Sequence, residues 1–230
     1  MKNKKKQFVV IGLGTFGYNV SCELVKHGMQ VLAIDRDETI VNEIAPFVTQ
    51  ALILDASDEK AMQKAGITDC DAALISVGDV KTSMLATLIV KDLGVNNIIV
   101  KCVDVWHSKV AVKLGANQVI YPELEMAKKF VASIVSPNIL EQIQLSNDYN
   151  LMEIVAPSDF WDKTLKELDI RNKFELTVIA VRSAVPTISA DGQNDIKEKI
   201  TMVPGSEYKV KQGDVLVVIG AVEALEKFKG

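Results

Sequence analysis

Gly12-Leu13-Gly14-Thr15-Phe16-Gly17 is the stretch of sequence that decides the fold. It matches the pattern G-x-G-x-x-G, which is common by itself and becomes specific through its surroundings. A β-branched run, Gln7 to Ile11, precedes it, and an amphipathic segment, Phe16 to Lys26, follows it. Asp35 ends the next apolar run, 18 positions after Gly17, close to the spacing at which an acidic residue meets a ribose. The stretch therefore predicts a strand, a glycine turn and a helix that together bind a dinucleotide-type nucleotide.

Six apolar runs alternate with amphipathic segments along the first two thirds of the chain. This alternation is typical of βαβ units, and right-handed crossovers then give a doubly wound parallel sheet. Gly28, Gly66, Gly94 and Gly115 follow helical segments, where a left-handed helix end costs glycine little. We expect strands at Gln7–Ile11, Gln30–Asp35, Gln50–Leu54, Ala72–Val77, Asn97–Cys102 and Gln118–Tyr121, and helices at 16–26, 38–45, 59–65, 81–93, 108–114 and 123–134.

The pattern changes near Ser136-Pro137-Asn138, because proline disfavours continuation of the preceding helix. We therefore predict two domains, residues 1–140 and 141–230, of which the second is a small α+β domain. Its expected strands are Leu151–Ala156, Leu176–Arg182 and Val215–Ile219, its expected helices are Thr164–Leu168 and Ala221–Lys227, and its expected turns are Ala190-Asp191-Gly192 and Lys211-Gln212-Gly213-Asp214.

The composition, 48% hydrophobic and 24% charged residues, is that of an ordinary globular protein. A formal net charge of -4 lends no support to a nucleic-acid-binding surface. The basic start, Lys2 to Lys6, is expected to be a solvated tail, with contact to an acidic or phosphate-rich partner as the alternative. No run approaches the roughly 18 apolar residues of a membrane span, and nothing resembles a signal peptide, so we expect a cytoplasmic protein. Cys22, Cys70 and Cys102 are expected to be small reduced hydrophobes.

The three glycines of the turn have different physical tasks. Gly12 permits the tight turn, Gly14 lets the backbone approach a pyrophosphate, and Gly17 lets the helix pack closely on the strand. The pyrophosphate then meets the unpaired amides and the positive dipole of a helix that begins near Thr15 and Phe16.

Other residues at the carboxyl ends of the strands complete the expected site. The Asp35 carboxylate accepts hydrogen bonds from ribose hydroxyls and repels a 2'-phosphate, which favours NAD or an adenosine nucleotide over NADP, although Arg36 beside it would tolerate a phosphate. Lys101 is a partner for phosphate charge, with a solvated surface lysine as the alternative. Two loops flank the ligand: Asp55, Ala56 and Ser57 near the adenine, and Ser76, Val77, Gly78 and, at the end of that loop, Asp79 near the phosphates or the distal half of a dinucleotide.

The order of several short motifs resembles one known family. Together they are similar to the RCK (KTN, or TrkA-like) proteins, the cytoplasmic gating subunits of bacterial Trk and Ktr potassium uptake systems, over nearly the whole chain. The resemblance implies a Rossmann-type domain followed by a small α+β RCK C-terminal domain. The motifs are Gly12 to Gly17, Leu54-Asp55-Ala56-Ser57, Gly115-Ala116-Asn117-Gln118-Val119-Ile120, Pro122-Glu123, Leu168-Asp169-Ile170-Arg171 and Gln212-Gly213-Asp214-Val215-Leu216.

The resemblance also implies a function in which no bond needs to break. Members assemble from dimers into rings of eight subunits, and these dock beneath an integral-membrane potassium channel subunit at the inner face of the membrane. Exchange of NAD(H), ATP or ADP reshapes the ring, and such a ligand acts only through its different affinity for the two ring states. The apolar segment from Phe130 to Leu140 corresponds to a helix that makes contacts between subunits, with intradomain core as the alternative.

Further site residues follow from the same resemblance. Glu123 matches a glutamate that helps hold a divalent cation between subunits, with complementation of the helix dipole as the alternative. Arg171 matches an arginine that contacts cyclic di-AMP in some members, and Ile170 matches the apolar wall beside it, with a surface arginine as the alternative. Thr177 stands where asparagine is frequent. Thr15 departs from the arginine of the Ktr branch, so the resemblance does not extend to strong discrimination of ATP from ADP.

Two other functions are compatible with the same fingerprint. An NAD-dependent oxidoreductase needs an acid or base near the nicotinamide, and the candidates are His27, His107 and Lys101, of which we expect both histidines to be structural or exposed. A redox-sensing transcription regulator needs a DNA-reading helix, and no basic recognition helix is evident. We therefore expect a non-enzymatic regulator without nucleic-acid binding.

Overall fold

The computed structural model describes residues 5–188 and 194–229. The chain divides into two compact units, Met1–Met126 and Ala127–Gly230, and each is described by itself below. The domain limits expected from the sequence, 1–140 and 141–230, stay a prediction.

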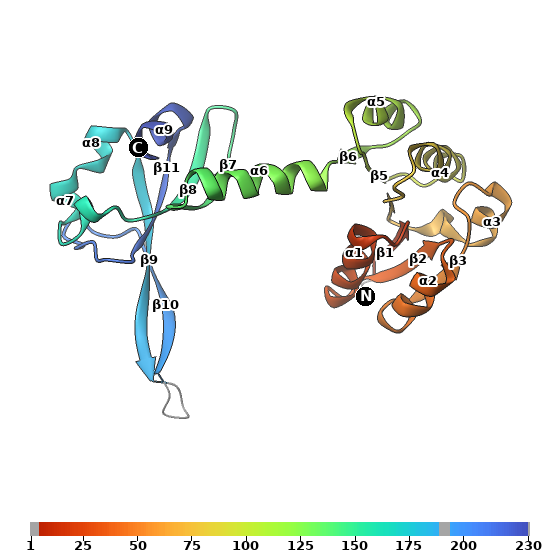
Figure 1. Cartoon of the computed structure of the whole chain (residues 1–230), viewed down its shortest axis with the longest axis horizontal. Helices are drawn as coiled ribbons and strands as arrows, with labels where there is room; N and C mark the ends of the chain where they lie inside the picture. The colour runs from red at the N-terminus through yellow and green to blue at the C-terminus, as the bar shows by residue number, and fades with distance from the viewer. Residues whose placement is uncertain (1–4, 189–193, 230) are drawn as a thin grey trace. The chain divides into compact units, whose positions relative to one another are not determined.

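The first unit is built on a six-stranded parallel sheet with the order β3-β2-β1-β4-β5-β6 (Figure 1). This order places β1 at the centre, as in the doubly wound dinucleotide-binding fold. The sheet and its connecting helices confirm the predicted fold class. The strands are β1 (Gln7–Ile11), β2 (Gln30–Asp35), β3 (Gln50–Ile53), β4 (Ala72–Ile75), β5 (Ile98–Lys101) and β6 (Gln118–Ile120), and the helices are α1 (Thr15–Lys26), α2 (Glu38–Ile44), α3 (Glu59–Lys64), α4 (Val80–Asp92) and α5 (Val105–Lys113), with 3-10 turns η1 (Ala45–Phe47) and η2 (Ile67–Asp69).

Apolar side chains from successive strand residues enter two different cores. Val9 and Ile11 pack in the cluster on one face of the sheet, whereas Val10 packs in the cluster on the other face. All three are at most 1% exposed, so β1 is covered on both faces. Burial on both faces explains why the strands are continuous apolar runs without polar alternation.

The expected helix ends are also confirmed. Gly28, Gly66, Gly94 and Gly115 all have φ between +70° and +111°, the left-handed region in which glycine meets no Cβ penalty. Cys22, Cys70 and Cys102 are free cysteines, and burial raises the pKa of the Cys70 thiol to about 11.

The second unit contains a five-stranded antiparallel sheet with the order β10-β9-β11-β8-β7. A core that includes Met152, Leu216 and Leu225 lies between the sheet and short helices. The β9–β10 pairing continues to Ile188, beyond the last β9 residue that pairs with β11, Arg182, as the long ribbon of Figure 1 shows. The elements are β7 (Ile139–Gln144), β8 (Tyr149–Val155), η3 (Ser158–Phe160), α7 (Leu165–Leu168), α8 (Ile170–Phe174), β9 (Thr177–Ile188), β10 (Asn194–Met202), β11 (Val215–Ala221) and α9 (Val222–Lys229).

Four elements of the second unit were not expected from the sequence: the strands β7 and β10, the helix α8 and the 3-10 turn η3. The two strands lie at the edges of the sheet, and β10 contains three consecutive charged residues, Lys197, Glu198 and Lys199. Charged edge strands lack the apolar run that marks a buried strand. The expected turn at 211–214 is present, and the one expected at Ala190-Asp191-Gly192 lies outside the described residues.

Helix α6 (Pro122–Val135) buries none of its side chains. Phe130, Val131, Ile134 and Val135 are 55% to 74% exposed. These four side chains are therefore not part of an intradomain core, whereas Ile139, near the end of the same segment, packs against the core of the second unit. Across the described ranges, no helix combines the length and the apolar character that crossing a bilayer requires.

Candidate functional site

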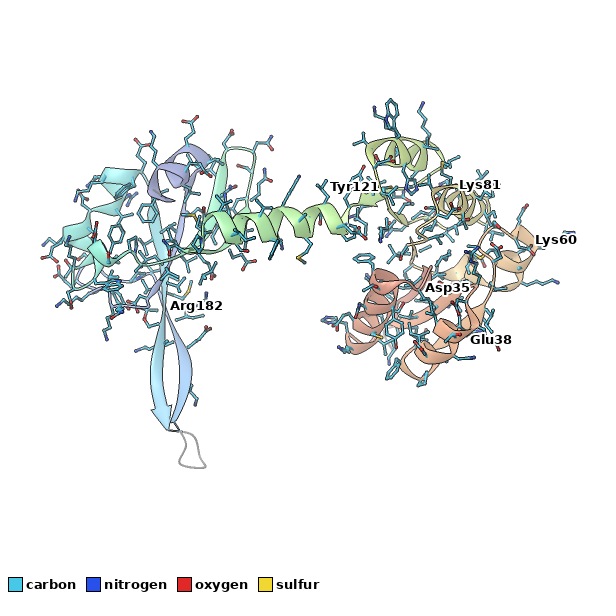
Figure 2. All side chains as sticks on the ribbon, in the orientation of Figure 1. Asp35, Glu38, Lys60, Lys81, Tyr121 and Arg182 are labelled. Atoms are coloured by element: carbon cyan, nitrogen blue, oxygen red, sulfur yellow. The ribbon has the colours of Figure 1, made fainter. Side chains whose placement is uncertain are left out.

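A cavity of about 470 Å³ lies in the first unit at the carboxyl ends of the strands, where Figure 2 labels Asp35. Its volume is in the range of small-molecule sites. It brings together most of the predicted nucleotide-site residues: Gly12, Gly14, Thr15, Phe16, Asp35, Arg36, Asp55, Ala56, Ser76, Val77, Gly78 and Lys101, with Glu123.

Two predicted residues, Gly17 and Ser57, do not line the cavity. Sequence reasoning also missed Asp37 and Thr82, which do line it, and named Asp79 only as the end of a loop. Asp37 and Asp79 begin helices directly after strand ends. Their position directly after a strand end is the feature of the sequence that could have identified them.

The glycine turn is fixed by contacts that leave no room for side chains. Gly12 has φ +92°, and a Cβ there would lie 2.7 Å from the backbone nitrogen of Val77. A Cβ on Gly17 would lie 1.9 Å from the carbonyl oxygen of Gly12. Gly14 differs, because nothing lies within 4 Å of its Cβ position. Gly12 and Gly17 thus serve packing inside the protein, whereas Gly14 keeps open space beside the cavity.

Helix α1 begins without a side-chain cap. Its N-cap residue is Gly14, and its first turn has no acidic residue. Helices α2 to α5 differ, since each has an aspartate whose carboxylate accepts a backbone N–H of the first turn: Asp37, Asp58, Asp79 and Asp104. The unpaired amides and positive end of α1 are therefore left for an anion on the cavity side.

The carboxylate of Asp35 is held against the glycine turn. Its Oδ2 accepts the backbone N–H of Leu13 at 2.6 Å, and its Oδ1 accepts that of Asp37 at 3.0 Å. Each carboxylate oxygen has a further lone pair. Asp35 can therefore accept ribose hydroxyls from the cavity while it fixes the turn.

The loop after β4 is tied to the same turn. Ser76 is 6% exposed, its hydroxyl donates to the Gly12 carbonyl at 3.1 Å, and its backbone nitrogen donates to Ile11 at 2.7 Å. At the end of this loop, the Thr82 hydroxyl donates to Asp79 and holds the pKa of that carboxyl below its usual value. These hydrogen bonds fasten both ends of the loop where it borders the cavity.

Ser57 acts within its own loop. Its hydroxyl and backbone nitrogen both donate to Asp55 Oδ1, at 2.7 and 2.9 Å. These bonds lower the pKa of the Asp55 carboxyl. Asp55 is therefore an anionic wall of the cavity, and Ser57 supports it from outside.

Lys101 and Glu123 form an ion pair in the cavity wall. The Lys101 ammonium donates to Glu123 Oε1 at 2.5 Å, with the lysine side chain 16% and the glutamate side chain 69% exposed. This contact lowers the pKa of the Glu123 carboxyl. Among the described residues, no group of three or more His, Cys, Asp or Glu side chains is placed to hold a metal ion. The divalent-cation site that the family resemblance implies at Glu123 stays a prediction.

The residues expected to meet a second ligand lie in the second unit. Ile170 is 3% exposed and belongs to the core, whereas Arg171 and Thr177 are exposed. Helix α8, which carries Arg171, contacts β9, which begins at Thr177. This site stays a prediction.

Neither histidine lines the cavity. His27 is exposed at the end of α1. His107 is 3% exposed, and its Nε2 lies 3.1 Å from the Ser83 hydroxyl. Burial lowers the pKa of the His107 imidazole. Its contacts join α5 to α4 and are structural.

Comparisons with known proteins agree along the whole chain. Residues 8–122 match the TrkA-N domain, and residues 151–229 match the TrkA-C domain. The chain is 36% identical to Ktr system potassium uptake protein C of Bacillus subtilis, an alignment that covers 98% of this chain and 96% of the relative. It is 33% identical to Ktr system potassium uptake protein A of the same organism, with 98% and 96% covered.

Solved structures show the same fold. The GsuK channel matches with a TM-score of 0.66 and 14% identity, covering 100% of this chain and 40% of that chain. The GsuK channel bound to NAD matches with a TM-score of 0.51 and 18% identity, covering 98% and 38%. This chain thus spans less than half of those channel chains.

Proposed function

Because this chain belongs to the family that carries the TrkA-N and TrkA-C domains and includes the Ktr potassium uptake proteins, we propose that it is a regulatory subunit of a potassium uptake system. In this role, a nucleotide bound in the first unit controls the gating of an integral-membrane potassium channel subunit. The ligand acts by binding two states of the assembly with different affinity. The chain itself catalyses no reaction.

The observation that carries this proposal is the open cavity at the start of α1. Gly14 leaves space beside it, the α1 amides have no side-chain cap, and Asp35 faces the same turn. These features fit a diphosphate attached to an adenosine ribose. NAD(H), ATP and ADP all carry that group, and a structure of one fold relative, GsuK, is described as bound to NAD.

An NAD-dependent oxidoreductase is less well supported. Hydride-transfer enzymes place an acid or base near the nicotinamide. The cavity wall contains neither histidine, and its lysine, Lys101, is paired with Glu123. We infer that the nucleotide is a signal and not a reactant.

The remaining parts of the proposal concern partners. The exposed apolar side chains of α6, which include Phe130 and Ile134, suit burial against another copy of the chain, first in a dimer and then in an octameric ring. The assembly would lie in the cytoplasm, at the inner face of the membrane through its channel partner. A divalent cation at Glu123 would need ligands from a second subunit or a phosphate, and cyclic di-AMP would bind at Arg171 and Thr177.

The test is potassium uptake in a bacterial strain that lacks its own uptake systems and expresses a Ktr-type membrane subunit. Co-expression of this chain is expected to restore rapid uptake, and the Gly14→Ala variant is expected to restore less. Mass spectrometry of the purified chain is expected to identify a retained adenosine nucleotide. Uptake that is the same with and without the chain would refute the regulatory role, and absence of binding to NAD, ATP and ADP would refute the nucleotide control.

A further inference from the structure

Acidic side chains outnumber basic side chains in the wall of the cavity. Five carboxylates line it, and two cationic side chains, Arg36 and Lys101, accompany them. Four of the carboxylates accept hydrogen bonds from nearby backbone or hydroxyl donors, and the fifth, Glu123, pairs with Lys101. Within the described ranges, this is the one ion pair formed between two residues of the cavity wall. The four are Asp35, Asp37, Asp55 and Asp79.

Lys101 is placed where a phosphate is expected. It ends β5, and its ammonium lies 5.9 Å from the centre of the Phe16 ring. Phe16 is the second residue of α1, the helix whose first turn has no side-chain cap for its amides. The ammonium therefore lies beside the anion-binding end of α1, and its side chain is only 16% exposed.

A poorly solvated ammonium needs a counter-charge, because burying an unpaired charge is costly. Glu123 supplies that charge through its ion pair with Lys101. Its side chain is 69% exposed, so it can turn into water at little cost, and ion pairs with exposed partners are weak. A phosphate bound to the α1 amides would pair with the Lys101 ammonium more favourably than Glu123 does, because the phosphate also gains charge-assisted hydrogen bonds from the helix end.

We propose that Glu123 and the phosphates of a bound nucleotide compete for Lys101, so that binding transfers the ammonium from the glutamate to the phosphate. The proposal rests on the nucleotide site proposed above and adds how that site is regulated. Glu123 lowers the affinity for phosphate-bearing ligands and leaves that for adenosine unchanged. It lies in the first turn of α6, the helix that begins in the first unit and continues into the second. Ligand binding thus releases a carboxylate at the start of the helix that connects the two units.

The test is calorimetric binding of ADP and of adenosine to the full chain, with a chelator present to remove divalent cations. The Glu123→Gln variant is expected to bind ADP roughly two- to fivefold more tightly than the unaltered chain, in line with the loss of a partly exposed ion pair. Its affinity for adenosine is expected to stay the same. Lys101→Gln is expected to weaken ADP binding, and adding Glu123→Gln to it is expected to have no further effect.

Glu125→Gln is the matched control. Glu125 is an exposed carboxylate in the same first turn of α6, and it does not line the cavity. Its substitution removes an equal charge and is expected to leave ADP affinity unchanged. The competition is refuted if Glu123→Gln binds ADP no more tightly than the unaltered chain, or if Glu125→Gln gives the same gain. A chain that binds neither ADP, NAD nor adenosine would instead refute the nucleotide site itself.

Discussion

The carboxylate of Asp35, at the end of β2, accepts the backbone N–H of Leu13 at 2.6 Å. This bond joins the second strand of the sheet to the glycine turn that follows the first, across 22 residues of sequence. The residue that would bind the ribose also shapes the loop that would bind the phosphates. The expected ribose site and the expected phosphate site are therefore joined by a hydrogen bond between Asp35 and the glycine turn.

Asp35→Ala is expected to weaken binding of NAD and ADP by about 1 to 3 kcal/mol, because charge-assisted hydrogen bonds to the ribose are lost. Isothermal titration calorimetry measures the change. Asp92→Ala is the control, since Asp92 ends α4 and does not line the cavity. Equal affinities of the unaltered chain and the Asp35 variant would contradict the assignment of Asp35 to the ligand.

Alanine substitutions at Gly14 and Gly17 are expected to have different effects, because one site borders the space for the ligand and the other is packed inside the protein. Gly14→Ala places a Cβ in open space at φ -60°, so the chain is expected to fold normally and to lose nucleotide affinity. Gly17→Ala places a Cβ 1.9 Å from the Gly12 carbonyl oxygen, so it is expected to lower the free energy of unfolding by about 1 to 3 kcal/mol. Thermal unfolding and calorimetric binding distinguish the two effects. Equal melting temperatures for the two variants would contradict this division.

Much of the first unit could be predicted from the sequence, because its strands are covered on both faces. Such burial makes each strand a continuous apolar run between helices with polar surfaces, and the bounds of β1 and β2 were predicted to the residue. The glycine turn and Asp35 were predictable for a similar reason, since only certain residue types meet their backbone and hydrogen-bond requirements.

Pairings between residues far apart in sequence could not be predicted. Ser76 was expected beside the phosphates, yet its hydroxyl is bound to the Gly12 carbonyl. Lys101 was expected as a phosphate partner or a solvated lysine, and Glu123 as a metal ligand or a charge that complements the helix dipole, and the ion pair between them was not predicted. Each contact depends on which strand ends meet in space, and strand order is not a property of any local pattern. The edge strands β7 and β10 were missed because a strand with one free edge needs no apolar run.

Ile134→Lys is expected to reduce the size of the assembly in solution. Ile134 is 62% exposed on α6, and a lysine there would put charge into any apolar contact between copies of the chain without disturbing a buried core. Multi-angle light scattering at micromolar concentration measures the mass. Lys128→Ala is the control, because Lys128 is an exposed charged residue on the same helix. An unaltered chain that is already monomeric would contradict the contact.

The stability of the first unit is expected to fall as the pH is lowered below about 6.5, the ordinary pKa of histidine. Burial lowers the pKa of His107 in the folded chain, so between the unfolded and folded values the unfolded chain binds the proton and is favoured. His107 Nδ1 also accepts the Val103 N–H, and a protonated ring would present a donor to that donor. Above the unfolded pKa this stability is fully present.

Chemical denaturation at pH 7.5 and pH 5.5 measures this effect. The loss attributable to His107 is expected to be at most about 1.4 kcal/mol for each pH unit within the window. In His107→Gln, the pH dependence is expected to be smaller, while His27→Gln, which alters an exposed histidine, is expected to leave it unchanged. Identical pH dependence in the His107 variant and the unaltered chain would assign the effect to other groups.

The central position of β1 also bears on how the chain acquires its structure at the ribosome. Of the six strands of this sheet, β1 is synthesised first, but it pairs with β2 on one side and with β4, residues 72–75, on the other. Until Ile75 has left the exit tunnel, one long side of β1 has no partner, and Val9 and Ile11 have only part of their final surroundings. A nascent chain of this kind exposes apolar surface for the time needed to make those residues, and chaperones bind such surfaces. Within this sheet, β1 is thus the strand with the longest interval between its synthesis and the pairing of both its sides.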